Sequence, residues 1–159
     1  MTGMVIVSTG ANRTNFARRV AYLCLYKLGK SPALIVLAIG IATAVVSAFV
    51  SNLATTIVMA PISIGILTEL HEEPGKSGLG MAIMLAIPIY SMIGGMALMS
   101  GSPSMNMAGI NTLENATGGS YTVSYSQWAS VGLICAVLVS LPTWLIYKFL
   151  FICSQQNPG

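Results

Sequence analysis

Hydrophobic positions in this chain form long uncharged runs that are interrupted by short polar segments. As one helix, the uncharged run 32–67 would be roughly 54 Å long, well beyond a hydrocarbon core of about 30 Å. Non-helical backbone inside a membrane is tolerated only where protein buries it or water reaches it. We therefore predict a re-entrant hairpin over 32–67, with two arms each about half a membrane deep. Its polar tip holds Ser47, Ser51, Asn52, Thr55 and Thr56.

A second apolar run is interrupted in a similar way. Residues 81–95 form an apolar arm, residues 94–106 are rich in glycine and serine and include Pro103, and residues 107–113 are short and mostly apolar. Glycine and proline are poorly suited to continuing a regular helix. We expect one membrane crossing over 81–113 that is broken at mid-depth, as in the discontinuous helices with which many transporters build their sites.

The other apolar segments predict three further elements. Residues 128–152 read as the one conventional transmembrane helix, with Trp128 and Trp144 as interfacial aromatics near its ends. Residues 15–30 read as an amphipathic helix that lies at the membrane interface, with an apolar arc that includes Leu23. Residues 1–10 are too short to cross a membrane and look like the end of a truncated span.

Composition and charge place these elements in a membrane protein. The chain has 159 residues, of which 55% are hydrophobic and 7% charged, and its mean hydropathy is +0.79. These values predict an all-α, multi-pass protein of a plasma or inner membrane. The polar loop 114–127 has no basic residue, so the predicted topology puts it outside and all seven basic residues on the cytoplasmic face.

Other chemistry has little support in the sequence. Cys24, Cys135 and Cys153 have no metal-binding spacing, and His71 lies in a charged loop that reads as solvated. No nucleophile stands with a general base inside the apolar runs, so we predict that the chain is not an enzyme. Nucleic-acid binding is also not expected, because membrane topology explains the basic segment before the hairpin better.

The two breaks together predict a binding site. Each helix that starts at a break leaves backbone N–H groups unpaired and carries a partial positive charge, which attracts an anion. Each helix that ends there leaves carbonyl oxygens, which suit sodium. No ionised side chain is needed for either interaction. The alternative is that the serines and glycines serve only as contact points for close helix packing.

Motifs at both breaks carry a family resemblance. Ser47 stands four residues before Ser51-Asn52, and Ala54-Thr55 and Pro61-Ile62 follow. The second break reads Ile93-Gly94-Gly95, then Gly101-Ser102-Pro103 and Asn106. This pattern resembles the first repeat of the divalent anion:sodium symporter family, the sodium-coupled dicarboxylate, citrate and sulfate transporters. The chain departs from it at Leu53, where the family has threonine, and at Asn106, which stands one place later.

The resemblance implies roles for particular residues. Sodium would bind to Ser47, Ser51, Asn52 and Gly101. The anionic substrate would contact Ser51, Asn52, Ser102 and Pro103. No metal other than sodium is implied.

The resemblance also implies partners. The family uses two inverted repeats and this chain matches only the first, so we expect residues 1–159 to be a single partial transport domain. Its partners would be membrane lipid, a small anion, and either a missing second repeat or a homodimer partner. Two alternatives stay open: a non-transporting scaffold or accessory subunit, and a dicarboxylate exchanger that does not use sodium.

Overall fold

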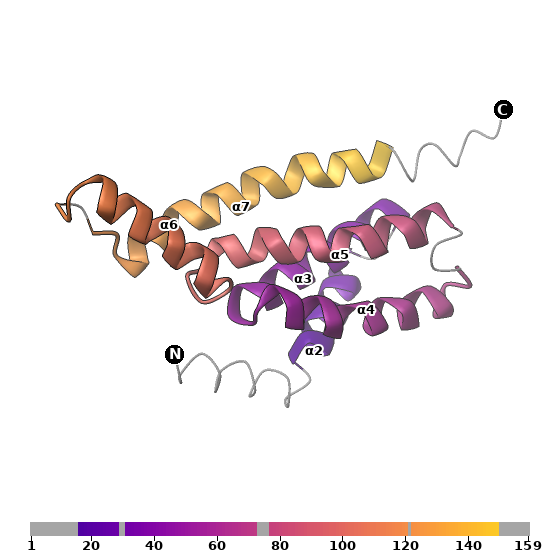
Figure 1. Ribbon diagram of the computed structural model, residues 1–159. Helices are drawn as coiled ribbons and strands as arrows, with labels where there is room; N and C mark the ends of the chain where they lie inside the picture. Colours follow the sequence, from indigo (N-terminus) through magenta and orange to yellow (C-terminus); the bar gives the residue numbers. More distant parts are fainter. Residues whose placement is uncertain (1–15, 29–30, 73–76, 121, 150–159) are drawn as a thin grey trace.

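The structure is a computed structural model that describes residues 16–28, 31–72, 77–120 and 122–149. Within these ranges the chain forms six α-helices and no strand, which confirms the all-α prediction. Four helices, α3, α4, α5 and α7, run along a common long axis (Figure 1). Helix α2 packs against α3 and α4, and α6 extends from one end of the bundle. The segment predicted to end a truncated span, 1–10, lies outside the described residues.

Helix α2 (Phe16–Leu28) packs through a narrow stripe of small side chains. Ala17 and Ala21 are buried, whereas Arg18 is exposed. Leu23, which we expected on the buried arc, is 63% exposed. It stands two residues after Ala21 and is therefore on nearly the opposite side of a helix with 3.6 residues per turn. That α2 lies flat at a membrane interface stays a prediction.

The segment predicted as a hairpin forms two helices, α3 (Pro32–Phe49) and α4 (Asn52–Glu69). The chain is extended at Val50 and Ser51, with ψ angles of 149° and 148°. Ser51 then begins α4, because its hydroxyl accepts a hydrogen bond from the Ala54 N–H at 3.4 Å. The run 32–67 is thus broken at the polar tip, as predicted.

The two arms of the hairpin are longer than expected. Each has 18 residues, or about 27 Å of helix, whereas we expected the first arm to end near Val46 and the second to begin near Ala54. By length and composition each is able to cross a membrane. The expected arm length was therefore wrong, and the re-entrant path remains a proposal.

The second break separates α5 (Gly78–Ala97) from α6 (Pro103–Ala116). Leu98 is extended, with ψ at 147°, and α6 begins after Ser102 with a proline in its first turn. Both helices exceed the predicted bounds. Helix α5 has 20 residues, about 30 Å, so it is long enough by itself to cross a membrane.

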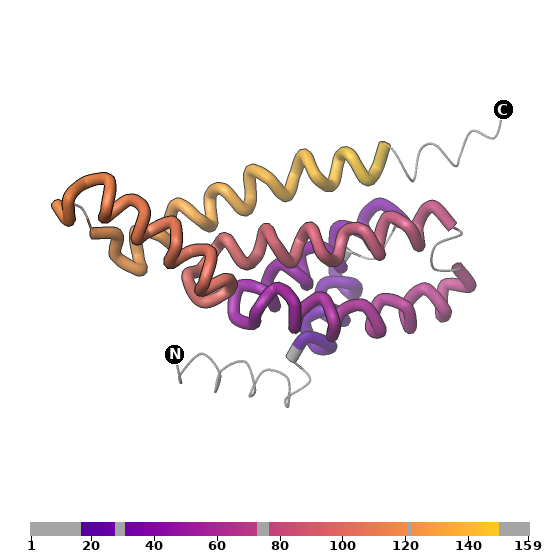
Figure 2. Tube along the Cα trace, viewed as in Figure 1, coloured from indigo at the N-terminus to yellow at the C-terminus, as the bar shows by residue number. Residues whose placement is uncertain are grey.

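Helix α7 (Tyr125–Tyr147) runs back along α5, as the continuous tube in Figure 2 shows. It begins three residues before the predicted Trp128, because Ser124 and Gln127 form a reciprocal capping box. Most of its apolar side chains face outward, with Ile134 and Leu138 more than 60% exposed. Such a surface suits lipid or another apolar partner.

Aromatic side chains connect α7 to the bundle by hydrogen bonds to backbone carbonyls. The Trp128 indole N–H donates to Met96 O at 3.2 Å, and the Trp144 indole N–H donates to Ala33 O at 2.9 Å. The Tyr90 hydroxyl of α5 donates to Ser140 O at 2.9 Å. The tryptophans that we expected as interfacial anchors therefore also make tertiary contacts between helices.

The centre of the bundle is the crossing of α3 and α5. Here Val36, Ile39, Ile83, Ile87 and Tyr90 are at most 1% exposed. Glycines let the two backbones approach: a Cβ atom at Gly94 would lie 2.1 Å from Ala44 O. Close approach through small residues is the usual way in which membrane helices associate.

Replacing Gly94 by alanine tests this crossing. We expect Gly94→Ala to lower the free energy of unfolding by about 1–3 kcal/mol, because the added methyl group meets backbone that has to move. Gly65→Ala on α4 is the matched control, since a Cβ there meets nothing within 4 Å; it should be neutral or stabilising by up to about 1 kcal/mol. Thermal unfolding in detergent micelles measures both, and equal midpoints for the two variants would contradict the close crossing.

Candidate functional site

The two breaks lie against each other in the folded chain. A Cβ atom at Gly95, near the end of α5, would lie 2.1 Å from Asn52 Oδ1 at the start of α4. A Cβ atom at Gly101, within the second break, would lie 2.7 Å from Ser47 O. Neither position has room for a side chain, so glycine is required where the two polar segments meet.

Three polar residues from three helices, the buried Ser47 and Ser91 and the half-buried Asn52, form a cluster at this junction. Ser47 Oγ of α3 lies 2.8 Å from Asn52 Oδ1 of α4 and 2.7 Å from Ser91 O of α5. Ser91 Oγ lies 3.2 Å from Ser47 Oγ and 2.9 Å from Asn52 O. Ser47 is fully buried and Ser91 is 1% exposed, so the surrounding protein and not bulk water has to satisfy the oxygens of these two serines.

The cluster has four close oxygen–oxygen contacts but only two hydroxyl protons, those of Ser47 and Ser91. A serine hydroxyl has one proton, so Ser47 and Ser91 can donate to only two of the four contacts at a time. Oxygen atoms that face each other without an intervening proton repel. A cation among them removes the repulsion, and a site made of hydroxyl, amide and carbonyl oxygens suits a hard cation. The junction thus gathers the kinds of oxygen that such a cation prefers.

Carbonyl groups at the helix ends are partly satisfied by other side chains. The Asn106 amide donates to Gly95 O and to Leu98 O, both at 3.0 Å. The Ser100 hydroxyl donates to Ala48 O at 3.1 Å. The Asn106 bonds connect α6 to the end of α5, and the Ser100 bond holds the break against the end of α3. Unpaired carbonyls at these helix ends would otherwise be costly.

The starts of α4 and α6 have the features expected of an anion site. Ser51 and Ser102 occupy the two N-cap positions, and neither helix has an acidic residue in its first turn. The Ser102 hydroxyl makes no capping bond, and Pro103 follows it. Both helix ends thus present partial positive charge without a carboxylate to neutralise it.

The structure brings together only part of the predicted site. Ser47, Asn52 and Gly101 meet at the junction, while the exposed Ser51 side chain caps α4 and makes no contact with the cluster. Ser102 directly follows Gly101, so the start of α6 is next to the junction. Ser91 was not predicted, although Gly95 stands four residues later and hence on the same helix face.

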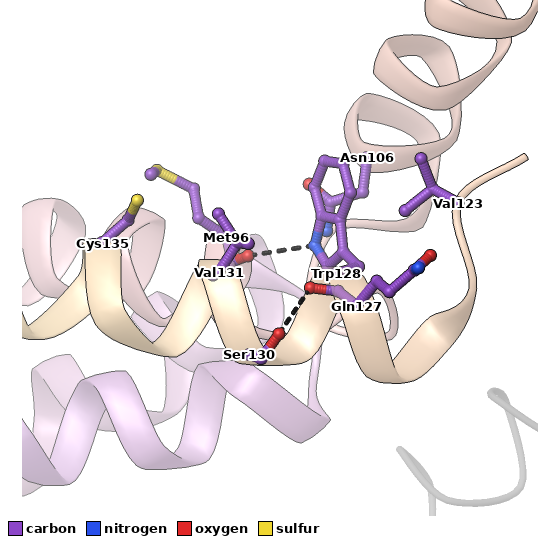
Figure 3. Close-up of a pocket in the computed structure, with 9 residues that line it drawn as sticks. Met96, Asn106, Val123, Gln127, Trp128, Ser130, Val131 and Cys135 are labelled. Atoms are coloured by element: carbon purple, nitrogen blue, oxygen red, sulfur yellow. Dashed lines mark hydrogen bonds between the residues drawn. The ribbon is translucent and has the colours of Figure 1, made fainter. Parts of the chain in front are cut away.

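A separate cavity of about 630 Å³ lies on the α7 side of the second break (Figure 3). None of the six residues predicted to bind sodium or substrate lines it, but Asn106 does. In Figure 3 the Asn106 and Trp128 side chains lie next to each other. The lining residues are Met96, Asn106, Val123, Gln127, Trp128, Ser130, Val131, Gly132 and Cys135.

Ionisable and metal-binding side chains are scarce around the junction. In the described part of the chain no group of three or more His, Cys, Asp and Glu residues is placed to hold a metal ion. Cys24 lies on α2, where burial raises the pKa of its thiol and the nearby Lys27 charge partly lowers it again. The junction therefore depends on hydroxyls, amides and backbone dipoles.

Comparison with known proteins agrees with the resemblance in the motifs. Residues 1–157 match a family described as citrate transporters. The sodium-dependent dicarboxylate transporter SdcS of Staphylococcus aureus strain USA300 is 27% identical over 154 residues, which cover 92% of this chain and 29% of SdcS. SdcS of strain NCTC 8325 is 26% identical over the same shares of the two chains. The chain thus spans less than a third of the length of these relatives.

These matches confirm the resemblance to the divalent anion:sodium symporters. The matched family and relatives are transporters and not enzymes. Four of the described helices are long and apolar enough to cross a membrane. Together with the matches, these helices identify an integral membrane protein with several passes.

The amide of Asn106 offers a direct test of the second break. We expect Asn106→Ala to lower the free energy of unfolding by about 1–3 kcal/mol, because the buried carbonyl of Gly95 and the half-buried carbonyl of Leu98 lose their donor. Asn111→Ala, at an exposed position of the same helix, should change it by less than about 0.5 kcal/mol. Thermal unfolding in detergent compares the two, and a similar effect of both substitutions would refute this role for Asn106.

Proposed function

The chain belongs to the citrate transporter family, and we propose that it is part of a secondary active transporter of divalent anions driven by sodium. The substrate class is a di- or tricarboxylate or sulfate. The chain would supply one of two repeats, and its hairpin would enter and leave the membrane on the cytoplasmic side. The relatives SdcS, which are sodium-dependent dicarboxylate transporters by name, support both the ion and the substrate class.

The observation that carries the proposal is the cluster of Ser47, Asn52 and Ser91 where the two breaks meet, which has fewer hydroxyl protons than oxygen contacts. Ser47 Oγ lies 2.8 Å from Asn52 Oδ1, and a Cβ atom at Gly101 would lie 2.7 Å from the backbone oxygen of the same Ser47. An uncharged, oxygen-rich and buried site favours a monovalent hard cation, because no carboxylate is present to balance a higher charge. Sodium is the cation that the family relationship supports.

The anion would bind beside the sodium ion. Ser51, Asn52, Ser102 and Pro103 stand at the starts of α4 and α6, and these starts carry partial positive charge. In the proposed site a substrate oxygen accepts hydrogen bonds from free backbone N–H groups and from the Ser51 and Ser102 hydroxyls. The bound sodium adds a full positive charge nearby, which explains physically why the two solutes would be carried together.

A complete transporter requires more than these residues. The chain covers 29% of SdcS, so a second hairpin and a second broken helix would come from the rest of a longer protein or from a partner chain. The basic residues gather on one predicted face, which favours a single orientation in the membrane. A second repeat of opposite topology therefore fits better than two copies of this chain inserted in opposite directions.

Sodium should stabilise the purified chain. We expect its thermal midpoint in detergent to rise with sodium chloride and not with potassium chloride at equal ionic strength, because a ligand that binds only the folded state stabilises it by RT ln(1 + [L]/Kd). At a sodium concentration of 100 times Kd the gain is about 2.7 kcal/mol. Identical midpoints in the two salts would favour the sodium-independent exchanger or the scaffold instead.

Asn52→Ala tests the site in transport. In cells that express the whole gene encoding this chain, we expect sodium-driven uptake of labelled succinate, citrate or sulfate to fall at least about tenfold, as the loss of one charge-assisted contact predicts. Asn111→Ala is the matched control and should leave uptake unchanged. Undiminished uptake by the Asn52 variant would remove Asn52 from the site.

A further inference from the structure

Ser91 is a buried hydroxyl of α5 that lies between the hairpin helices. It is 1% exposed and contacts both Ser47 Oγ of α3 and Asn52 O of α4. We propose that Ser91 is a further ligand of the cation site, and that its hydroxyl oxygen joins Ser47 Oγ and Asn52 Oδ1 around the ion. The inference rests on the sodium coupling proposed above.

The hydrogen-bond geometry allows an arrangement in which no hydroxyl proton lies between the side-chain oxygens of the cluster. The Ser47 hydroxyl donates to Ser91 O at 2.7 Å, and the Ser91 hydroxyl donates to Asn52 O at 2.9 Å. Both protons then point at backbone carbonyls. The oxygens Ser47 Oγ, Ser91 Oγ and Asn52 Oδ1 keep free lone pairs, with Ser47 Oγ at 3.2 Å from Ser91 Oγ and 2.8 Å from Asn52 Oδ1.

Three neighbouring oxygens with free lone pairs and no shared proton can serve as part of the ligand set of a hard cation. Without the ion, the two hydroxyl protons serve only two of the four oxygen contacts, so two close oxygen pairs stay without a proton between them. The ion satisfies all three oxygens at once. The site would thus be completed by α5 and would connect three helices.

The orientation of Ser91 differs from that of hydroxyl side chains that bond within their own helix. Hydroxyl side chains within helices commonly donate to the carbonyl four residues earlier. Thr43 does so to Ile39 O at 2.7 Å, and Thr56 does so to Asn52 O at 2.9 Å. Ser91 instead donates to α4, across 39 residues of sequence, and contacts α3 across 44.

A sodium ion bound in this way would attach the hairpin tip to the broken helix. Ser47 and Asn52 belong to the hairpin, whereas Ser91, Gly95 and Gly101 belong to the α5–α6 segment. Because a ligand stabilises the state in which its contacts are complete, sodium would favour the conformation in which the two breaks meet. The proposed anion site at the starts of α4 and α6 would then be formed only in that conformation.

The experiment measures sodium-dependent thermal stabilisation of the full chain in detergent. We expect Ser91→Ala to raise the sodium concentration for half-maximal stabilisation about tenfold or more, the effect of losing one charge-assisted contact. Ser91→Cys preserves the size of the side chain and replaces oxygen with a soft sulfur that suits sodium poorly, so it should give the same shift if the alanine variant does not fold. Thr43→Ala, which removes an equally buried hydroxyl, should leave the sodium dependence unchanged.

The possible results separate the role of Ser91 from the proposed function. A half-maximal sodium concentration within twofold of the unmodified chain for both Ser91 variants would overturn the role of Ser91 and leave sodium coupling intact. An equal shift in Thr43→Ala would show a general packing effect and would also overturn it. If the unmodified chain shows no stabilisation by sodium relative to potassium, the sodium coupling and the role of Ser91 both fail.

Discussion

Backbone that leaves a helix inside an apolar bundle is the feature on which the rest of this structure depends. Such backbone has no water to bond with, so its N–H and C=O groups must find partners within the protein. At the end of α5 the partners are Asn106 and Trp128. At the end of α3 one partner is Ser100. Each break is thus stabilised by side chains that the other break or a neighbouring helix supplies.

Glycine makes this mutual stabilisation possible. Gly94 meets the backbone at Ala44, Gly95 meets the Asn52 amide, and Gly101 meets Ser47 O, each at a distance that excludes a side chain. The resulting junction is neutral and rich in oxygen. In the proposed function, the charge would arrive with the transported ions, so an empty site would avoid the high cost of burying an unpaired ionised side chain.

Outside the junction, much of the surface is apolar. Leu53 and Ile57 on α4 are 74% and 64% exposed, and α7 exposes apolar side chains along its length. These faces suit lipid, the remainder of a transporter, or both, and the chain is much shorter than its SdcS relatives. The core of α3 and α5 nevertheless supplies a tightly packed centre within this part of the protein.

The sequence by itself determined where regular structure stops. Polar residues and glycine or proline inside uncharged runs located both breaks to within a few residues, because these residue types act locally on the backbone. The motifs around them also identified the family. The lengths of the helices could not be predicted as well from the sequence, because caps and tertiary contacts decide where a helix begins and ends. Ser124 and Gln127, for example, set the start of α7.

Only the tertiary structure decided which faces meet. It placed Ser91 beside Ser47 and Asn52, turned Leu23 outward, and gave Trp128 and Trp144 carbonyl partners on other helices. These contacts join residues that are tens of positions apart in the sequence, so no local sequence pattern predicts them. Their physical reason is the close crossing of α3 and α5, which fixes the orientation of both helices and brings the two breaks to one place.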